Sequence, residues 1–132
     1  MVLGLFRIRF EARVHPRHVE LVCTGIYSRS EALRIGDEGY RRAALEDRIC
    51  LLIDVRKING RLPTVLDRYD VGVHIAEKYL NSESRVRLAV LGNEPMIHPE
   101  RFGELVARNR GADARAFTDE TLALAWLLER PA

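Results

Sequence analysis

RICLLIDV, residues 48 to 55, is an almost wholly apolar run that leads into an aspartate and a valine. A strand of this composition is typical of the middle of a parallel sheet, where both faces are buried. VRLAVLG, residues 86 to 92, has the same character. Residues 64 to 81 between them predict a helix, because Thr64 precedes an apolar pattern of helical spacing. The three segments together predict a β-α-β unit with parallel strands.

The N-terminal segment predicts an antiparallel hairpin. Residues 5 to 14 alternate apolar and charged side chains, which is typical of a strand with one face in water. Residues 15 to 18 read HPRH and predict a turn, and residues 19 to 27 predict a second strand. Because the link is short, we expect the two strands to pair antiparallel.

Capping residues place the other helices. Ser28 begins one helix with Glu31 at capping-box spacing, Pro99 suits a first helical turn, and Thr118 is the expected cap of the last helix. Residues 114 to 117 predict a short final strand. The predicted order is β-β-α-β-α-β-α-β-α. This order predicts an α/β fold with a mixed five-stranded sheet, in which the first strand is antiparallel and the rest are parallel.

Helical spacing also predicts which side chains face inward. The helix 64 to 81 is expected to bury a stripe made of Leu66, Tyr69, Val73, Ala76 and Leu80. Its outer, solvated face is expected to carry Asp67, Asp70, His74 and Glu77. The helix that begins near Pro99 is expected to bury Phe102, Leu105, Val106 and Asn109.

Length and charge narrow the class of protein. The chain has 132 residues, which fits a single domain over residues 1 to 132. Its net charge of +2, from 21 basic and 19 acidic residues, is too balanced to predict binding to nucleic acid or to an anionic membrane. No run approaches the roughly 18 apolar residues of an integral membrane segment. Cys23 and Cys50 lie in apolar runs without a C-x-x-C motif, which is typical of buried thiols in a reducing cytoplasm.

The carboxyl edge of the predicted sheet is the candidate binding site, because ligands of open α/β sheets bind beyond the strand ends. A basic loop and a helix N-terminus lie there, and helix N-termini favour anions. The candidate binding residues are Asp54, Arg56, Lys57, Gly60, Arg61 and Thr64. The sequence contains no glycine-rich phosphate motif and no nucleophile elbow. The competing interpretation is that Thr64 only caps a helix and that the arginines are solvated.

Asp54 could bind a metal ion or act as a base, but no second carboxylate stands at ligand spacing. We therefore predict a strand-end aspartate that accepts hydrogen bonds from loop amides. Asp70 and His74 could share a proton or a metal at helical spacing, although a solvated polar face is the simpler interpretation. His15 and His18 flank a turn without the further ligand that zinc needs. We expect no metal, no cofactor and no catalytic site.

The last helix, LALAWLLERP at residues 122 to 131, is apolar nearly all round. One face can pack on the sheet, and the rest needs cover. Two interpretations stay open: a homodimer contact through Leu124 and Leu128, and packing against a neighbouring helix.

The chain carries LLIDVRKINGRLPTVLDRYDVG at residues 51 to 72, VRLAVLG at residues 86 to 92 and RFGELVARNRGADARAFTDETLALAWL at residues 101 to 127. Together these stretches resemble the SpoIIAA-like family, which is related to the STAS domains of anti-anti-sigma factors and sulphate transporters. The resemblance implies a β/α superhelix with its helices largely on one side of the sheet. It implies no catalytic machinery.

The resemblance also bears on phosphorylation. In anti-anti-sigma factors the corresponding strand ends in an aspartate followed by a serine that a partner kinase phosphorylates. Asp54 matches that aspartate, whereas Val55 occupies the place of the serine. Thr64 is the only candidate substitute, because a phosphate at this helix N-terminus would meet free N–H groups. The departure at Val55 argues against phospho-switching of the usual kind.

The favoured function is a non-enzymatic regulatory module in bacterial signalling. It would bind a protein partner or a small ligand through residues 55 to 63 and the start of the following helix. The family also resembles lipid-carrying Sec14-type domains in fold, which implies as the alternative a carrier of a small apolar or lipid-like ligand. The expected cavity lining is Tyr27, Tyr40, Tyr69 and Phe102. A hydrolase or isomerase that uses Asp54 or the Asp70–His74 pair is a third hypothesis.

Overall fold

The computed structural model describes residues 7 to 129 and contains the predicted order of strands and helices. Residues 5 and 6 of the predicted first strand lie outside the described residues. The elements are β1 (Arg9–Val14), β2 (Val19–Ile26), α1 (Arg29–Leu45), β3 (Cys50–Asn59), α2 (Val65–Asn81), β4 (Arg87–Leu91), α3 (Phe102–Asn109), β5 (Ala114–Phe117) and α4 (Glu120–Leu127).

The strands form one mixed sheet in the order β1-β2-β3-β4-β5. β1 pairs antiparallel with β2, so that Phe10 lies opposite Cys23, and the other neighbours pair in parallel. Leu51 of β3 sits between Val19 of β2 and Leu88 of β4. The apolar run therefore forms the centre of the sheet, and the predicted fold class is confirmed.

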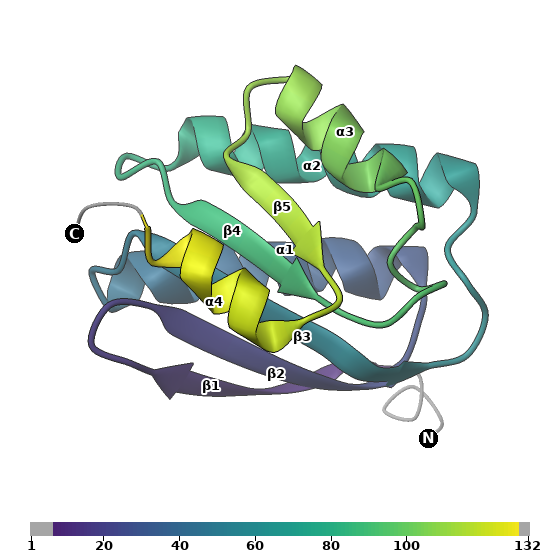
Figure 1. The fold of residues 1–132 in the computed structure, drawn as a ribbon, viewed down its shortest axis with the longest axis horizontal. Coiled ribbons are helices and arrows are strands. Elements are labelled where there is room, and N and C mark those ends of the chain that lie inside the picture. The colour runs from purple at the N-terminus through teal and green to yellow at the C-terminus, as the bar shows by residue number, and fades with distance from the viewer. Residues whose placement is uncertain (1–6, 130–132) are drawn as a thin grey trace.

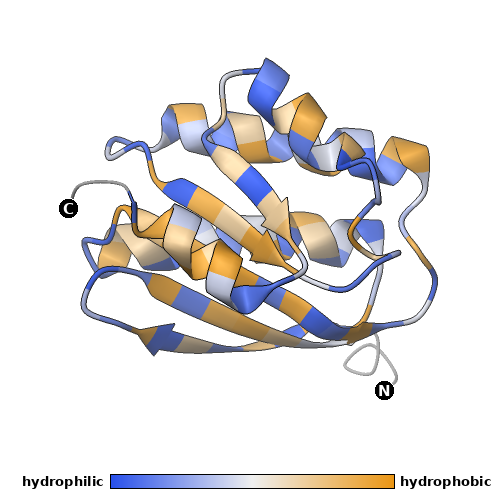
Figure 2. Ribbon diagram, in the orientation of Figure 1, coloured by the Kyte–Doolittle hydropathy of each residue, from blue (hydrophilic) through white to orange (hydrophobic). Residues whose placement is uncertain are grey.

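Helices α1, α2 and α3 cover one face of the sheet, and α4 covers part of the other (Figure 1). Successive residues of β3 point to opposite faces, and each face carries its own core. The core under the three helices includes Val19, Leu21, Leu51, Ile53 and Leu88. The core under α4 is built from Cys50, Leu52, Ala89, Leu91, Ala123 and Leu127. Figure 2 shows the difference between central and edge strands. The central strands, buried on both faces, are largely orange, whereas β1, which has one face in water, alternates with blue.

β3 is longer than predicted, and the expected loop from residue 55 is wrong up to residue 59. Lys57 and Asn59 pair with Thr24 and Ile26 of β2, after a shift of register between Val22 and Thr24. Backbone pairing to β2 thus keeps this polar stretch extended, a tertiary effect that its own composition does not reveal. Asp54 consequently lies inside the strand and not at its end.

The predicted inward face of α2 is wrong in part. Leu66, Tyr69 and Leu80 are exposed, whereas Ala76 is buried as predicted, together with Asp67, Gly72 and Ile75. Glycine permits the close packing: a Cβ at Gly72 would lie 2.8 Å from the carbonyl oxygen of Gly103 in α3. The helix is therefore turned so that its small residues meet its neighbours.

Two smaller predictions are corrected in the last helices. Leu105 of α3 is exposed and Asn109 faces solvent, whereas Ala107 is the buried residue. Asp119, not Thr118, caps α4, because its carboxylate accepts the backbone N–H of Leu122 at 3.0 Å. None of the helices within residues 7 to 129 has the length and apolar character that a membrane crossing requires.

Candidate functional site

A cavity of about 200 Å³ lies between α2 and the sheet. Val55 and Ile58 line it from the extended part of β3, Val90 lines it from β4, and Gly36 and Gly72 line it from the helices above. α2 packs against α1 and α3, and the absence of side chains at Gly36 and Gly72 lets Ile75 and Val106 approach closely. The surface exposed to the cavity is mostly apolar, although Arg68, Arg101 and Glu104 are among its lining residues, so it suits a guest that is largely apolar.

Only one of the four aromatic residues predicted to line a cavity does so. Tyr27 is part of the wall. Tyr40 is buried in the core beside it, Tyr69 is exposed and accepts a hydrogen bond from Arg110, and Phe102 lies edge-on to His98. The residues that the sequence reasoning missed are Val, Ile and Ala, which look the same whether they fill a core or line a void.

At its lining residues Tyr27 and Pro63, the rim of the cavity is supported by the buried carboxylate of Asp67, which does not itself line the cavity. Its Oδ2 accepts the Tyr27 hydroxyl at 3.1 Å, the Arg61 guanidinium at 2.9 Å and the backbone N–H of Thr64 at 3.1 Å. Thr64 completes a capping box by accepting the N–H of Asp67. Arg61 also lies 5.1 Å from the ring centre of Tyr27. These four residues form a closed network between β2 and α2.

This network shifts two pKa values. Burial alone would raise the pKa of Asp67, but the hydrogen bonds from Arg61, Thr64 and Tyr27 outweigh it and lower the pKa to about 2. Burial and the bond to Asp67 raise the pKa of Tyr27 to about 12. Asp67 is therefore a charged structural anchor, and its predicted place on a solvated face is wrong.

A second part of the rim is the segment of residues 93 to 101. Arg68 of α2 donates to the carbonyl oxygens of Pro95 and Met96, both at 2.9 Å. Ile97 is buried, and Met96, Ile97 and His98 line the cavity. Arg68 thus fastens this segment against the cavity wall.

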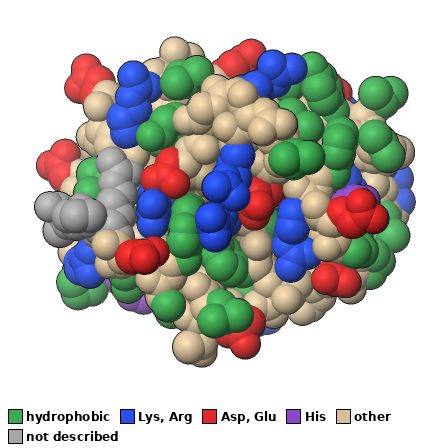
Figure 3. Space-filling view, turned by 45° about the horizontal axis from the view of Figure 1, so that its top comes forward, with side chains coloured by type: hydrophobic (Ala, Val, Ile, Leu, Met, Phe, Trp, Pro, Cys, Tyr) green, Lys and Arg blue, Asp and Glu red, His purple; other side chains and the backbone are tan. Residues whose placement is uncertain are grey.

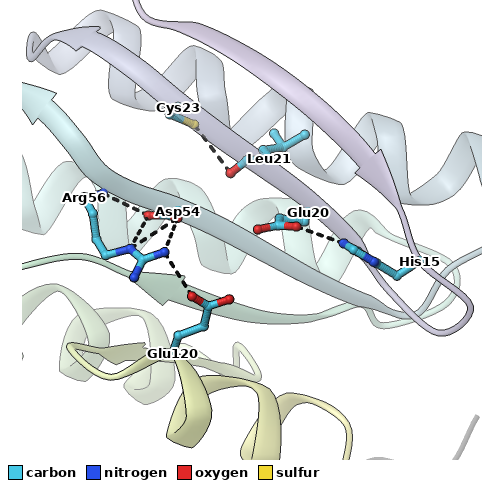
Figure 4. Close-up of polar contacts among 7 residues, drawn as sticks. All are labelled: His15, Glu20, Leu21, Cys23, Asp54, Arg56 and Glu120. Carbon is cyan, nitrogen blue, oxygen red and sulfur yellow. Dashed lines mark hydrogen bonds and ion pairs between the residues drawn. The ribbon is translucent and has the colours of Figure 1, made fainter.

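Asp54 and Arg56 lie on the other face of the sheet, under α4 (Figure 4). Asp54 is only 6% exposed and points to the side of Cys50 and Leu52, as strand alternation requires. Arg56 donates to both its oxygens, with Nη2 at 2.8 Å from Oδ2, and bridges to Glu120 of α4 at 3.1 Å. Burial would raise the pKa of Asp54, but the bonds from Arg56 outweigh it and lower it. The pair joins strand to helix and leaves no free base.

The six predicted binding residues are therefore divided between two surfaces. Arg61 and Thr64 belong to the Asp67 network beside the cavity, and Gly60, whose φ of 103° suits the turn that follows β3, precedes them in the chain. Lys57 is exposed near the end of β3. Asp54 and Arg56 are separated from the rim by the sheet.

The other proposed proton-sharing pair is not formed. Asp70 binds Arg29 at 2.7 Å, and His74 contacts Asp37 at 2.7 Å. His15 stacks on His18 and contacts Glu20 at 2.8 Å on the same side of the sheet as Asp54 (Figure 4). No cluster of three or more potential metal ligands occurs within the described part of the chain.

Two solved structures show the same architecture. An anti-sigma factor antagonist from Mycobacterium paratuberculosis superposes with a TM-score of 0.60 at 12% identity, covering 92% of this chain and 94% of that one. A protein with a SpoIIAA-like fold from Shewanella loihica gives 0.50 at 19% identity, covering 96% and 98%. The chain has the SpoIIAA-like fold. The resemblance seen in the sequence is confirmed at this level, although no protein-family model and no curated protein matches the sequence.

Within the SpoIIAA-like fold, the valine at the place of the usual serine and the one candidate for phosphorylation, Thr64, both have structural roles. Val55, which follows Asp54, lines the cavity. The Thr64 hydroxyl accepts a backbone N–H in the capping box. A phosphate on Thr64 would break this bond and face the Asp67 carboxylate, which is destabilising.

The last helix of the SpoIIAA-like fold lies alone on its face of the sheet within the described chain (Figure 1). Leu124 and Leu128, the predicted dimer residues, pack partly against the core under α4. Leu122 is the exposed leucine, at 61%. Packing on the sheet thus covers much of the apolar surface for which the sequence predicted a helical neighbour or a second copy.

Proposed function

We propose that this protein is a non-enzymatic regulatory module that binds a protein partner at the start of α2. The docking surface comprises Arg61, Leu62, Val65, Leu66 and Tyr69. Its four apolar side chains are all exposed, with Leu66 at 73%. Apolar side chains gather at the upper right of Figure 3, on the side where α2 begins in Figure 1. An exposed apolar group of this kind, next to an arginine, is typical of a protein-binding site.

The docking surface rests on a rigid base. Thr64 and Asp67 close the capping box at the helix N-terminus, and Arg61 is held by Asp67. A pre-organised surface loses little conformational entropy on binding, which favours affinity. The surface includes part of the predicted segment 55 to 63, but the structure separates Arg56 from it.

The shared fold supports a protein partner, since one protein with this fold is an antagonist of an anti-sigma factor. The charge distribution is in keeping with this choice. Figure 3 shows basic and acidic side chains intermingled over one face, without a broad area of either sign. The thiols of Cys23 and Cys50 are buried, which accords with a location in the bacterial cytoplasm.

Affinity capture from the source organism tests this proposal. Val65→Ser, Leu66→Ser and Tyr69→Ser, combined in one variant, should lose a partner that the parent protein retains. The matched control replaces three exposed leucines elsewhere, Leu45, Leu80 and Leu122, with serine. If both variants retain every partner, the docking surface is wrong.

The cavity favours a second candidate function, the binding of a small apolar ligand. Its volume of about 200 Å³ exceeds the roughly 150 Å³ of an engineered apolar cavity that binds benzene. Native mass spectrometry of freshly purified protein should show an added mass. Val90→Phe, which fills the cavity, should abolish it, whereas Val14→Phe on the exposed edge of the sheet should not. A clean apo mass with no uptake of added octan-1-ol would contradict this function.

Homodimerisation through Leu124 and Leu128 stays a prediction. Light scattering at high micromolar concentration tests it, and a monomer there would contradict it.

A further inference from the structure

The size of the cavity limits the kind of apolar ligand it can hold. By proportion to benzene in roughly 150 Å³, a volume of about 200 Å³ holds on the order of eight carbon atoms. One short chain or a small ring system fits, whereas a two-chain lipid does not.

Some of the charged side chains around the cavity have an ion-pair partner, and others do not. Arg101 lies 3.5 Å from Glu94, and Glu104 lies 3.7 Å from Arg108, so these charges are paired. The Arg115 guanidinium lies over the ring of Trp126, 5.6 Å from its centre. Like Arg115, Arg68 has no ion-pair partner within the described residues, but Arg115 is directed to Trp126, which packs against the core under α4 on the opposite face of the sheet. The hydrogen-bond partners of Arg68 within residues 7 to 129 are two backbone carbonyls, and no carboxylate there lies within ion-pair distance.

Arg68 is half-buried, and this partial burial lowers its pKa from the ordinary value. The Asp67 carboxylate acts on this cation through space but is itself bonded to Arg61, so no carboxylate within residues 7 to 129 contacts Arg68. A half-buried cation without a contacting anion is costly, and an anion beside it recovers part of that cost. His98 adds a donor. Its Nδ1 lies 3.2 Å from the backbone nitrogen of Glu100 and accepts that N–H, so the neutral ring carries its proton on Nε2.

We infer that the cavity binds a single-chain or small-ring amphiphile with an anionic head, and that Arg68 binds the head. This inference rests on the ligand-binding function proposed for the cavity. The apolar part lies against Val55, Ile58 and Val90, and the head faces the guanidinium at the rim. Arginine suits this role, because its planar fork matches the two oxygens of a carboxylate.

Titration calorimetry with three eight-carbon probes tests the inference. Each probe is used below the concentration at which it forms micelles. Octanoate carries the anionic head, octan-1-ol a neutral one and octylammonium a cationic one. The parent protein should bind octanoate about tenfold more tightly than octan-1-ol, as expected for one charge-assisted contact, and octylammonium most weakly. Val90→Phe should abolish binding of all three, with Val55→Phe as a second filling variant in case the first does not fold.

Variants of Arg68 separate its charge from its contact with the Pro95–Met96 segment. Arg68→Gln should weaken the binding of octanoate about tenfold, to the affinity of octan-1-ol, and should leave the affinity for octan-1-ol unchanged. Arg68→Lys should keep most of the preference for octanoate over octan-1-ol, because it retains the positive charge. Arg41→Gln removes the same charge from an exposed pair on α1 and should change nothing.

Each other outcome contradicts a different statement. Equal binding of octanoate and octan-1-ol by the parent protein overturns the anionic head but leaves the cavity function standing. An equal loss of both probes in Arg68→Gln means that Arg68 only positions the rim, and this also overturns the inference. If the parent protein binds no probe, the cavity function itself is wrong.

Discussion

The hydroxyl of Tyr27 donates to the buried Oδ2 of Asp67 at 3.1 Å, and so joins the end of β2 to the first turn of α2. The same carboxylate holds Arg61 and the cap at Thr64. One buried anion thereby orders both the cavity rim and the docking surface.

Replacing Asp67 with Asn should lower the free energy of unfolding by about 2 kcal/mol at pH 7, because a charge-assisted hydrogen bond is lost. The folded-state pKa of about 2 lies below the ordinary 3.8. The contribution of Asp67 is therefore complete above pH 3.8 and is lost as the pH falls through 2. Urea unfolding at pH 7, 4, 3 and 2 measures this. The difference in free energy of unfolding between the parent protein and the variant should become smaller as the pH falls.

The control for this experiment is Asp70→Asn, on the same helix. Asp70 forms a partly exposed pair with Arg29, so the expected change is below about 1 kcal/mol. A difference for Asp67→Asn that stays constant down to pH 2 would show that the carboxylate charge is not the source of the stabilisation.

Removing Arg56 should destabilise the protein more than removing the charge of Asp54. Arg56→Ala leaves the Asp54 carboxylate buried without a counter-charge and should cost about 3 kcal/mol. Asp54→Asn leaves an arginine that is 39% exposed and still contacts Glu120, so it should cost about half as much. Chemical denaturation of both variants checks the order, and the reverse order would mean that Asp54 is hydrated in solution.

Gly72 should not tolerate a methyl group. A Cβ there would lie 2.8 Å from the Gly103 carbonyl oxygen and from Val106, so Gly72→Ala should destabilise the protein by about 1–3 kcal/mol. Gly103→Ala is the matched control, since its Cβ would be 3.6 Å from the nearest atom of α2, the carbonyl oxygen of Arg68. Thermal unfolding should show the control unchanged or slightly stabilised. If both variants lost similar stability, the close contact between α2 and α3 would not be centred on Gly72.

Cys23 should be unreactive in the folded protein. Its side chain is fully buried, and burial raises the pKa of the thiol to about 12. Because the thiolate is the reactive form, a disulfide reagent at pH 8 should modify Cys23 only as fast as the protein unfolds. Comparing the parent with Cys50→Ser in buffer and in urea isolates this thiol. Rapid modification in buffer would mean that the sheet opens locally at β2.

The fold could be predicted from local patterns. The alternation before Val14 and the apolar run at residues 50 to 53 each reflect one strand and its exposure to water. Ser28 and Thr64 mark true helix starts, since each accepts a backbone N–H three residues on. The arrangement as one mixed sheet followed from the order of the elements alone.

The site was predicted only in part. Arg61 and Thr64 lie beside the cavity, but Asp67 was assigned to solvent because its helical position matched exposed neighbours. Nothing local distinguishes Val55 or Val90 in a cavity wall from the same residues in a closed core. The length of β3 was missed because Lys57 and Asn59 owe their extended conformation to pairing with β2.

The amino-acid sequence determines the order, type and mutual direction of the elements, because strand and helix periodicity and the capping residues act over a few residues. The cavity, the position of Arg68 at its wall and the network around Asp67 exist only in the packed molecule. They arise where α2 meets α3 at Gly72 and Gly103, and where β3 continues along β2 past Asp54. These contacts join residues far apart in the chain, and their geometry depends on how whole elements pack together.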